Sequence, residues 1–175
     1  MKASRLLGYL LMSASIIFTI SAFVAQNSSR TASKSISIEG TYKFILRKFP
    51  DGTEVKPPKV IGMLTFTKYY RNFNITELEP NGKHLLYSIN SKYKLTDKEY
   101  TVTNLFSGIF DETKLGSKTS GFSFATNQTD STPVSIKEGK IIIEDPFDKV
   151  ILTFDKDKLT VVAKGNFTDY WEKVK

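Results

Sequence analysis

Apolar and polar residues alternate along most of the chain beyond Ile38, with the period of two that is typical of half-buried β-strands. The first such segment is Ile38–Phe49. Its two faces carry Ile38, Gly40, Tyr42, Phe44 and Leu46 on one side and Glu39, Thr41, Lys43 and Arg47 on the other. Ile45 is the apolar exception on the polar face. We therefore expect the folded domain to begin with this strand, with Arg47 on its polar side.

Turn sequences separate further segments of the same kind. Pro80-Asn81-Gly82 is a strong turn signal. Hairpins are predicted around 96–99 and 155–158, where polar residues separate two apolar, alternating segments. The stretch 106–131 is less regular, and 127–132 is expected to be a loop. About eight to ten short strands at this spacing predict an all-β fold, either an antiparallel barrel or a sandwich.

The first 25 residues have the pattern of a targeting segment. Lys2 and Arg5 precede an apolar run over residues 6–24, which is long enough to span a bilayer as a helix. A cleaved signal peptide and a retained membrane anchor both fit this leader. Residues 26–37 are small and polar and are expected to be a flexible linker. We thus expect residues 38–175 to be exported to the periplasm or secreted, with a membrane tether through residues 6–24 as the alternative to release.

Composition excludes several kinds of site. The chain has no cysteine and a single histidine, His84, so disulfides, thiolate nucleophiles and cysteine-based zinc sites are excluded, and we expect no metal and no cofactor. The net charge of +7 is spread along the chain without a basic and aromatic cluster, and nucleic acid is not an expected partner. The spacing of Asp145, Asp148, Asp155 and Asp157 matches no calcium loop, and they are interpreted as turn formers. No catalytic residue is assigned.

Three short motifs resemble bacterial and fungal lipocalin-like domains of the calycin type. They are Gly40-Thr41-Tyr42 in the first strand, Pro57-Pro58 ahead of the apolar strand at 62–66, and the terminal run Tyr170-Trp171-Glu172-Lys173-Val174. That family commonly begins Gly-Thr-Trp, so Tyr42 is a departure. The resemblance covers residues 38–175 and implies a single up-and-down antiparallel barrel with a cup for a small apolar ligand. It also implies a structural floor made by Gly40, Tyr42 and Trp171, with Lys173 or Arg47 capping an aromatic ring.

Strand parity identifies the residues that would line such a cup. They are Phe44, Leu46, Phe66, Phe73, Tyr93, Tyr100, Phe122, Phe124 and Phe154. The same side chains could instead fill the barrel completely, because barrels of about eight strands occur in both forms.

The leading interpretation is a non-enzymatic, exported lipocalin-like protein that binds or sequesters a small hydrophobic molecule, such as a lipid or fatty acid. One alternative is an isomerase- or hydratase-type enzyme that acts on an apolar substrate inside the barrel, with Tyr93, Tyr100 or a buried carboxylate as acid or base. Another is an envelope interaction module without a ligand. Two titratable groups that converge in the cup would favour catalysis, whereas an entirely apolar cup would favour carriage.

Overall fold

The structure, a computed structural model, describes residues 36–112, 121–123 and 127–175. These described ranges form an all-β fold and contain no α-helix. They belong to one compact unit, Ser35–Lys175. The predicted leader at 1–25 and the predicted linker up to residue 35 lie outside the described residues. Within the part of the chain that the structure describes, no helix is long and apolar enough to cross a membrane.

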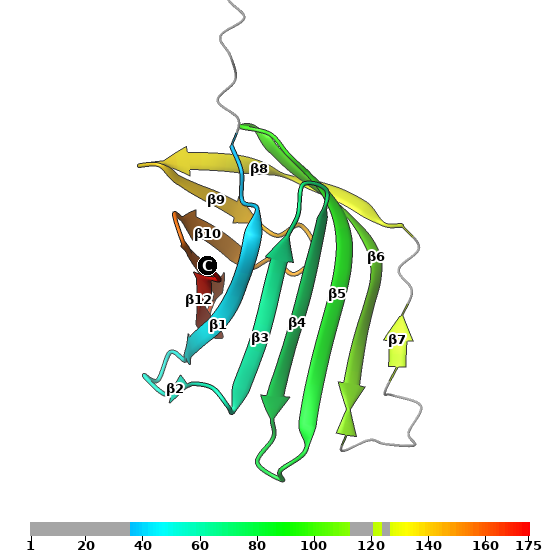
Figure 1. Ribbon diagram of the computed structural model, residues 1–175, viewed down its shortest axis with the longest axis vertical. Coiled ribbons are helices and arrows are strands. Elements are labelled where there is room, and N and C mark those ends of the chain that lie inside the picture. The colour runs from blue at the N-terminus through cyan, green and yellow to red at the C-terminus, as the bar shows by residue number, and fades with distance from the viewer. Residues whose placement is uncertain (1–35, 113–120, 124–126) are drawn as a thin grey trace, which may run out of the picture. The chain divides into compact units, whose positions relative to one another are not determined.

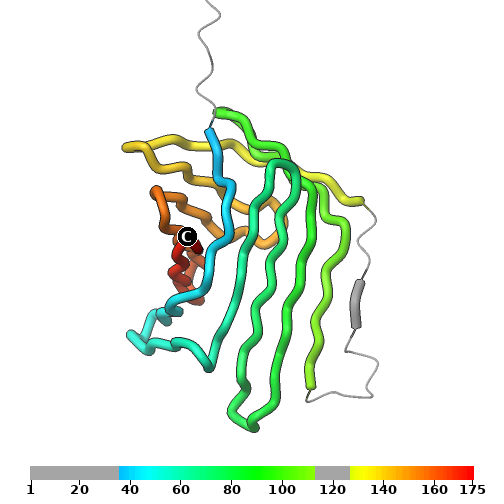
Figure 2. The backbone as a smooth tube through the Cα atoms, in the orientation of Figure 1, coloured from blue at the N-terminus to red at the C-terminus, as the bar shows by residue number. Residues whose placement is uncertain are grey.

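Ten of the described strands pair edge to edge into a closed antiparallel barrel, which confirms the all-β prediction and decides between barrel and sandwich. Neighbouring barrel strands follow one another along the chain, and β12 pairs with β1 to close the ring. Figure 1 shows β1 and β3–β6 side by side, with β8–β12 crossing behind them, and Figure 2 traces the same path. The strands are β1 (Gly40–Lys48), β2 (Glu54–Val55), β3 (Val60–Phe66), β4 (Tyr70–Leu78), β5 (His84–Leu95), β6 (Glu99–Asp111), β7 (Gly121–Ser123), β8 (Thr129–Lys137), β9 (Lys140–Glu144), β10 (Ile151–Asp155), β11 (Lys158–Ala163) and β12 (Phe167–Lys173).

The turns that connect these strands follow the predicted hairpins. β5 ends and β6 begins on either side of Thr96, whose hydroxyl accepts a hydrogen bond from the backbone N–H of Glu99 at 2.9 Å. β10 and β11 are joined through Lys156, which has a positive φ of 55°. The turn between β4 and β5 contains Gly82, with a φ of 79° that favours glycine.

The loop predicted at 127–132 is wrong in part, because β8 already begins at Thr129. It pairs with β6 from Thr129, opposite Thr103, to Pro133, opposite Glu99. Most of these β8 residues are polar and exposed, so no apolar alternation marked the strand in the sequence. Its backbone hydrogen bonds to β6 hold it in place instead.

Aromatic side chains fill one end of the barrel. Tyr42 and Phe154 pack edge to face with ring centroids 5.9 Å apart, and Phe66 lies 5.3 Å from Phe154. The ammonium of Lys173 lies 5.9 Å from the centroid of the Tyr42 ring. Gly40 has a φ of 146°, and a Cβ there would collide with the Lys173 side chain. The expectation that a cation caps an aromatic ring is therefore confirmed for Lys173, and glycine at 40 makes room for it.

A bulge in β1 reverses the direction of the side chains that follow it. Phe44 pairs with Trp171, whereas Leu46 pairs with Tyr170, so Ile45 is the extra residue between them. Beyond this point Arg47 points inward and is only 8% exposed. The placement of Arg47 on the polar face is therefore wrong, because one inserted residue moves every following side chain to the opposite side of the sheet.

Candidate functional site

A cavity of about 250 Å³ lies inside the barrel. Its walls come from β1, β3, β4, β5, β10, β11, β12 and the loop between β9 and β10. Much of the lining is apolar, including Leu64, Phe66, Phe73, Leu152, Val161 and Trp171. The lining also holds two arginines and three aspartates, namely Arg47, Arg71, Asp145, Asp148 and Asp169. The cup is thus predominantly apolar, with a group of charged side chains in its wall.

Trp171 is the largest side chain of the apolar wall. Its indole packs edge to face on Phe44, with centroids 5.4 Å apart, and lies 6.1 Å from the centroid of Phe73. A Cβ on Gly62 would lie 2.9 Å from Cη2 of the indole, so glycine at this position lets the ring approach the β3 backbone closely. The indole Nε1 is enclosed and has no hydrogen-bond partner among the described residues. Packing alone therefore positions Trp171.

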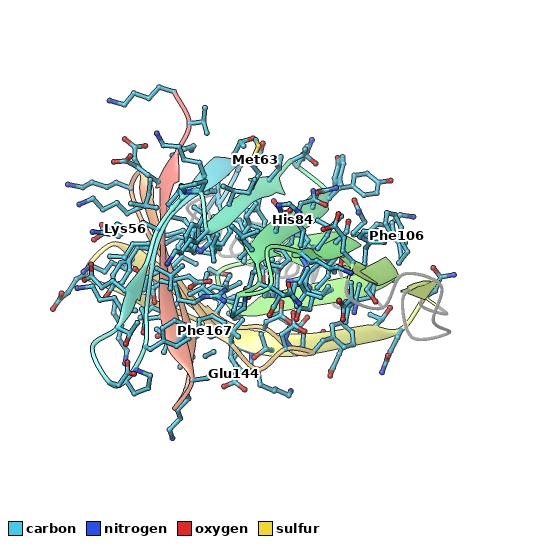
Figure 3. The ribbon with its side chains drawn as sticks, turned by 90° about the horizontal axis from the view of Figure 1, so that it is seen from below. Lys56, Met63, His84, Phe106, Glu144 and Phe167 are labelled. Carbon is cyan, nitrogen blue, oxygen red and sulfur yellow. The ribbon has the colours of Figure 1, made fainter. Side chains whose placement is uncertain are left out.

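Arg47 is the centre of the first charged group. Its Nε and Nη2 donate to the two carboxylate oxygens of Asp169 at 2.7 and 2.9 Å, and its Nη1 donates to Glu77 at 2.5 Å. Its guanidinium carbon lies 3.9 Å from the ring centroid of Phe167, the first residue of β12, which is labelled in Figure 3. Burial alone would lower the pKa of Arg47, but its hydrogen bonds and charge interaction with Asp169 raise it overall. This group is held as a fixed ion pair with a second acidic partner.

Arg71 forms the second charged group, across the barrel from β4 to the loop after β9. Its Nη1 donates to Oδ2 of Asp145, and it also lies 3.4 Å from the hydroxyl of Tyr100. The other oxygen of Asp145 accepts backbone N–H groups from Phe147 at 2.9 Å and Asp148 at 3.1 Å, which fixes the loop. Although burial lowers the pKa of Arg71, the charges of Tyr100 and Asp145 raise it overall. Asp145 therefore both forms the turn and neutralises a buried cation.

Asp148 lies at the rim of the cavity and is exposed. Partial desolvation there, followed by the negative charge of Asp145, raises the pKa of Asp148 above its usual 3.8. Asp148 forms a hydrogen bond through its backbone N–H, and its carboxylate forms none with the described residues. In the described part of the chain, the other two aspartates of the lining each form an ion pair with an arginine, whereas Asp148 does not.

Replacing Asp148 with Asn should raise the free energy of unfolding near neutral pH. An acid whose pKa is raised on folding destabilises the folded state once the pH exceeds that pKa, so its removal helps at neutral pH. The gain should shrink as the pH falls through the raised pKa and disappear below the usual value of 3.8. Because Asp148 is exposed, we expect less than about 1 kcal/mol. Urea unfolding near neutral pH and at about pH 3 measures this, and Asp97→Asn in the exposed β5–β6 turn is the control. An equal gain at both pH values would contradict it.

The predicted cup-lining residues fall into different surroundings. Two of them line the cavity, namely Phe66 and Phe73. Others are buried in the core outside the lining, namely Phe44, Tyr93, Tyr100 and Phe154. Leu46 lies half-buried beyond the β1 bulge, and Phe122 is placed in β7 opposite Gly108. Phe124 lies outside the described residues.

The tyrosine hydroxyls that were considered as acid or base have hydrogen-bond partners within the protein, and that of Tyr100 accepts from Arg71. Tyr93 donates to the backbone carbonyl of Thr67 at 2.5 Å, and burial raises its pKa. Burial also raises the pKa of Tyr100 to about 12. Neither ring belongs to the cavity lining. His84 is exposed and contacts Glu112 at 3.0 Å, also outside the lining.

The predicted floor residues separate as well. Gly40 and Tyr42 lie at the filled end of the barrel, outside the cavity lining. Trp171 lines the cavity, so its expected role as a floor residue alone is incomplete. A single indole packs against the core on one side and bounds the cavity on the other because the cavity begins directly beside the aromatic layer.

The charged residues of the cavity were missed as site residues, although most of them carried a sequence signal. Arg71 shares strand parity with Phe73 and Ile75, which face inward, and Asp169 shares it with Trp171.

The chain was compared with family models, curated proteins and solved structures, and it matches none of them. Its function therefore has to be argued from the cavity and its charged wall.

Proposed function

We propose that this protein is an exported, lipocalin-like barrel that binds or sequesters a small, largely apolar ligand, lipid- or fatty-acid-like in character. The observation that carries this proposal is the mostly apolar cavity inside a closed barrel. Closed barrels of this size range can hold one small ligand. The basic and apolar leader supports export, either as a released protein or as one tethered through residues 6–24.

The cavity volume limits the size of the ligand. A dry protein cavity of about 150 Å³ binds benzene, which has six heavy atoms. By proportion, about 250 Å³ accommodates roughly ten heavy atoms. The lining surrounds such a molecule with Leu64, Phe73, Leu152 and Trp171. We expect a medium-chain or single-ring compound rather than a whole phospholipid.

Replacing Val161 with Phe should weaken ligand binding at least about tenfold, because the added ring occupies the cavity that Val161 lines. Val162→Phe is the matched control: it is the next residue of β11, is equally half-buried, and lies outside the lining. Trp171 is the only tryptophan of the chain, so its fluorescence reports on the cavity during a titration. Equal loss in both variants would contradict a cavity-bound ligand.

A direct test of the function is native mass spectrometry of protein purified after expression of the full chain. We expect a bound species of small mass that is retained by the wild type and reduced in Val161→Phe but not in Val162→Phe. Extraction and mass analysis then identify its chemical class. A protein that retains nothing and gives no Trp171 fluorescence change with any apolar probe would contradict the proposal.

An enzymatic role is the second candidate, and Asp148 is the observation that favours it. A carboxylate with a raised pKa at the wall of an apolar cup can remove a proton from a bound substrate. For a ketone, a C–H bond next to the carbonyl breaks, the proton passes to the carboxylate, and an enolate forms that takes a deuteron back from D₂O. Deuterium incorporation into 2-nonanone, followed by NMR, should then be accelerated by the wild type and not by Asp148→Asn. Exchange no faster than in buffer would exclude this base.

A further inference from the structure

We propose that the ligand of this cavity carries a neutral hydrogen-bond acceptor, such as the carbonyl of a ketone, ester or amide, and that Arg71 binds this group while the apolar body lies against Trp171 and Phe73. The inference rests on the proposed function and narrows its ligand class. It separates neutral carbonyl compounds from ionised fatty acids, which share the same apolar body.

Arg71 has hydrogen-bond donors that the protein leaves unused. The residue is only 7% exposed, and it lines the cavity. Nη1 is bound to Asp145 and Tyr100, but Nε and Nη2 donate to none of the described residues. Among the described residues, Nε1 of Trp171 is the side-chain nitrogen that is both enclosed by protein and without a hydrogen-bond partner. Nε and Nη2 of Arg71 also lack a partner, so they are not enclosed. Because buried polar groups normally find partners, unused N–H groups of a residue that lines a cavity are suited to an acceptor atom of a ligand.

The charge of Arg71 is already balanced, so it offers hydrogen bonds rather than net positive charge. Asp145 forms a direct ion pair with it. Arg47 is likewise paired with Asp169, and it also contacts Glu77. Both cations of the lining are thus neutralised before any ligand enters.

The remaining carboxylate makes the wall unfavourable for an anion. The lining holds two arginines against three aspartates, and Asp148 is the aspartate outside the two ion pairs, although the charge of Arg71 also acts on it and lowers its pKa in part. A ligand carboxylate would have to lose its hydration inside the cavity and would be repelled by the charge of Asp148 at the rim. A carbonyl needs only the hydrogen bonds that Arg71 has free, and it carries no charge that Asp148 would repel.

A set of C9 probes with different head groups tests this inference. The probes are 2-nonanone, which is neutral, nonanoate, which is negative, and nonan-1-amine, which is positive. We expect 2-nonanone to bind the full-chain protein at least about tenfold more tightly than nonanoate at low salt, measured by Trp171 fluorescence and checked by calorimetry. Tighter binding of nonanoate or nonan-1-amine would overturn the inference and leave the proposed function standing. No binding of any probe would overturn the proposed function itself.

Asp148→Asn tests the electrostatic part at an exposed residue whose replacement should not disturb folding. It should strengthen nonanoate binding about threefold to tenfold and leave 2-nonanone unchanged, because it removes the unpaired negative charge at the rim. Asp97→Asn, in the distant β5–β6 turn, should change neither affinity. An unchanged ratio of nonanoate to 2-nonanone affinity in Asp148→Asn would overturn the charge argument.

The carbonyl stretch of bound 2-nonanone tests the role of Arg71 directly. A hydrogen bond from a guanidinium lowers the frequency of this infrared band relative to the ketone in an alkane solvent. We expect the lowered band in the wild type and a smaller lowering in Arg71→Lys, which keeps a positive charge for Asp145 but removes the planar donor fork. A wild-type band at the alkane frequency would overturn the inference, whether or not the Arg71→Lys variant folds.

Discussion

Replacing Asp145 with Asn is expected to lower the free energy of unfolding by about 3 kcal/mol. The reason is that Arg71, which is 7% exposed, would keep its charge inside the barrel and lose the carboxylate that neutralises it. Asn can still accept the backbone N–H groups of Phe147 and Asp148, so the turn itself should persist. The loss would therefore measure the unpaired charge rather than the loop. Urea unfolding of the full chain near neutral pH gives the value.

Three control variants distinguish the effect of leaving a charge buried in Asp145→Asn from the effect of losing an ion pair or a turn hydrogen bond. Asp155→Asn removes the acid of the exposed pair with Lys140, which is 3.3 Å long, and should cost less than about 1 kcal/mol. Asp145→Ala should cost more than Asp145→Asn, because it also removes the acceptor for the turn. A double variant, Arg71→Met with Asp145→Leu, should be more stable than Asp145→Asn, since no charge is left buried. An effect of Asp145→Asn as small as that of Asp155→Asn would contradict the buried pair.

The strands and hairpins of the barrel were largely predictable because their determinants are local. Alternation and turn residues gave the β5–β6 and β10–β11 hairpins, and these pairs need only a short connection. The first residues of β8, from Thr129, were not predicted as a strand because they are polar on both sides and their partner β6 lies about 30 residues earlier in the chain. Pairing of that kind leaves no periodic trace in the sequence.

The inward positions of the charged residues in the cavity wall were partly predictable from the sequence. Arg71 points to the same face of β4 as Phe73, and Asp145 follows Ile143 of β9 by two residues. Each charge therefore occupies an inward position. Treating Asp145 as a turn former captured its hydrogen bonds to the backbone and missed its partner. What the sequence does not indicate is that these two positions, 74 residues apart, meet across the barrel.

Arg47 could not have been placed by parity. The bulge after Phe44 is a property of how β1 pairs with β12, and it inverts the pattern that the sequence presents. Ile45 was the visible anomaly, an apolar residue on the polar side, and it is the inserted residue. Its outward apolar side chain, 38% exposed, is a consequence of turning Arg47 toward Asp169. The first strand thereby contributes both to the filled end and to the charged wall.

Replacing Trp171 with Ala should lower the free energy of unfolding by about 3 to 5 kcal/mol. The indole is 2% exposed and packs on Phe44, while Gly62 leaves no side chain that could move into the vacated volume. Trp171→Phe should cost much less, below about 1.5 kcal/mol, because it keeps an aromatic ring and loses no hydrogen bond: Nε1 has no partner in the described part of the chain. Urea unfolding followed by far-UV circular dichroism compares the two variants.

Added indole provides a further check on the Ala variant. The space left by the side chain is apolar and joins the existing cavity, so free indole should bind there and restore part of the lost stability in proportion to its concentration. The wild type, whose own indole occupies that space, should gain less from the same concentration. If Trp171→Phe proved as destabilising as Trp171→Ala, Nε1 would have to be making a bond that matters to folding. Trp171 would then be held by a polar contact rather than by packing between the aromatic layer and the cavity.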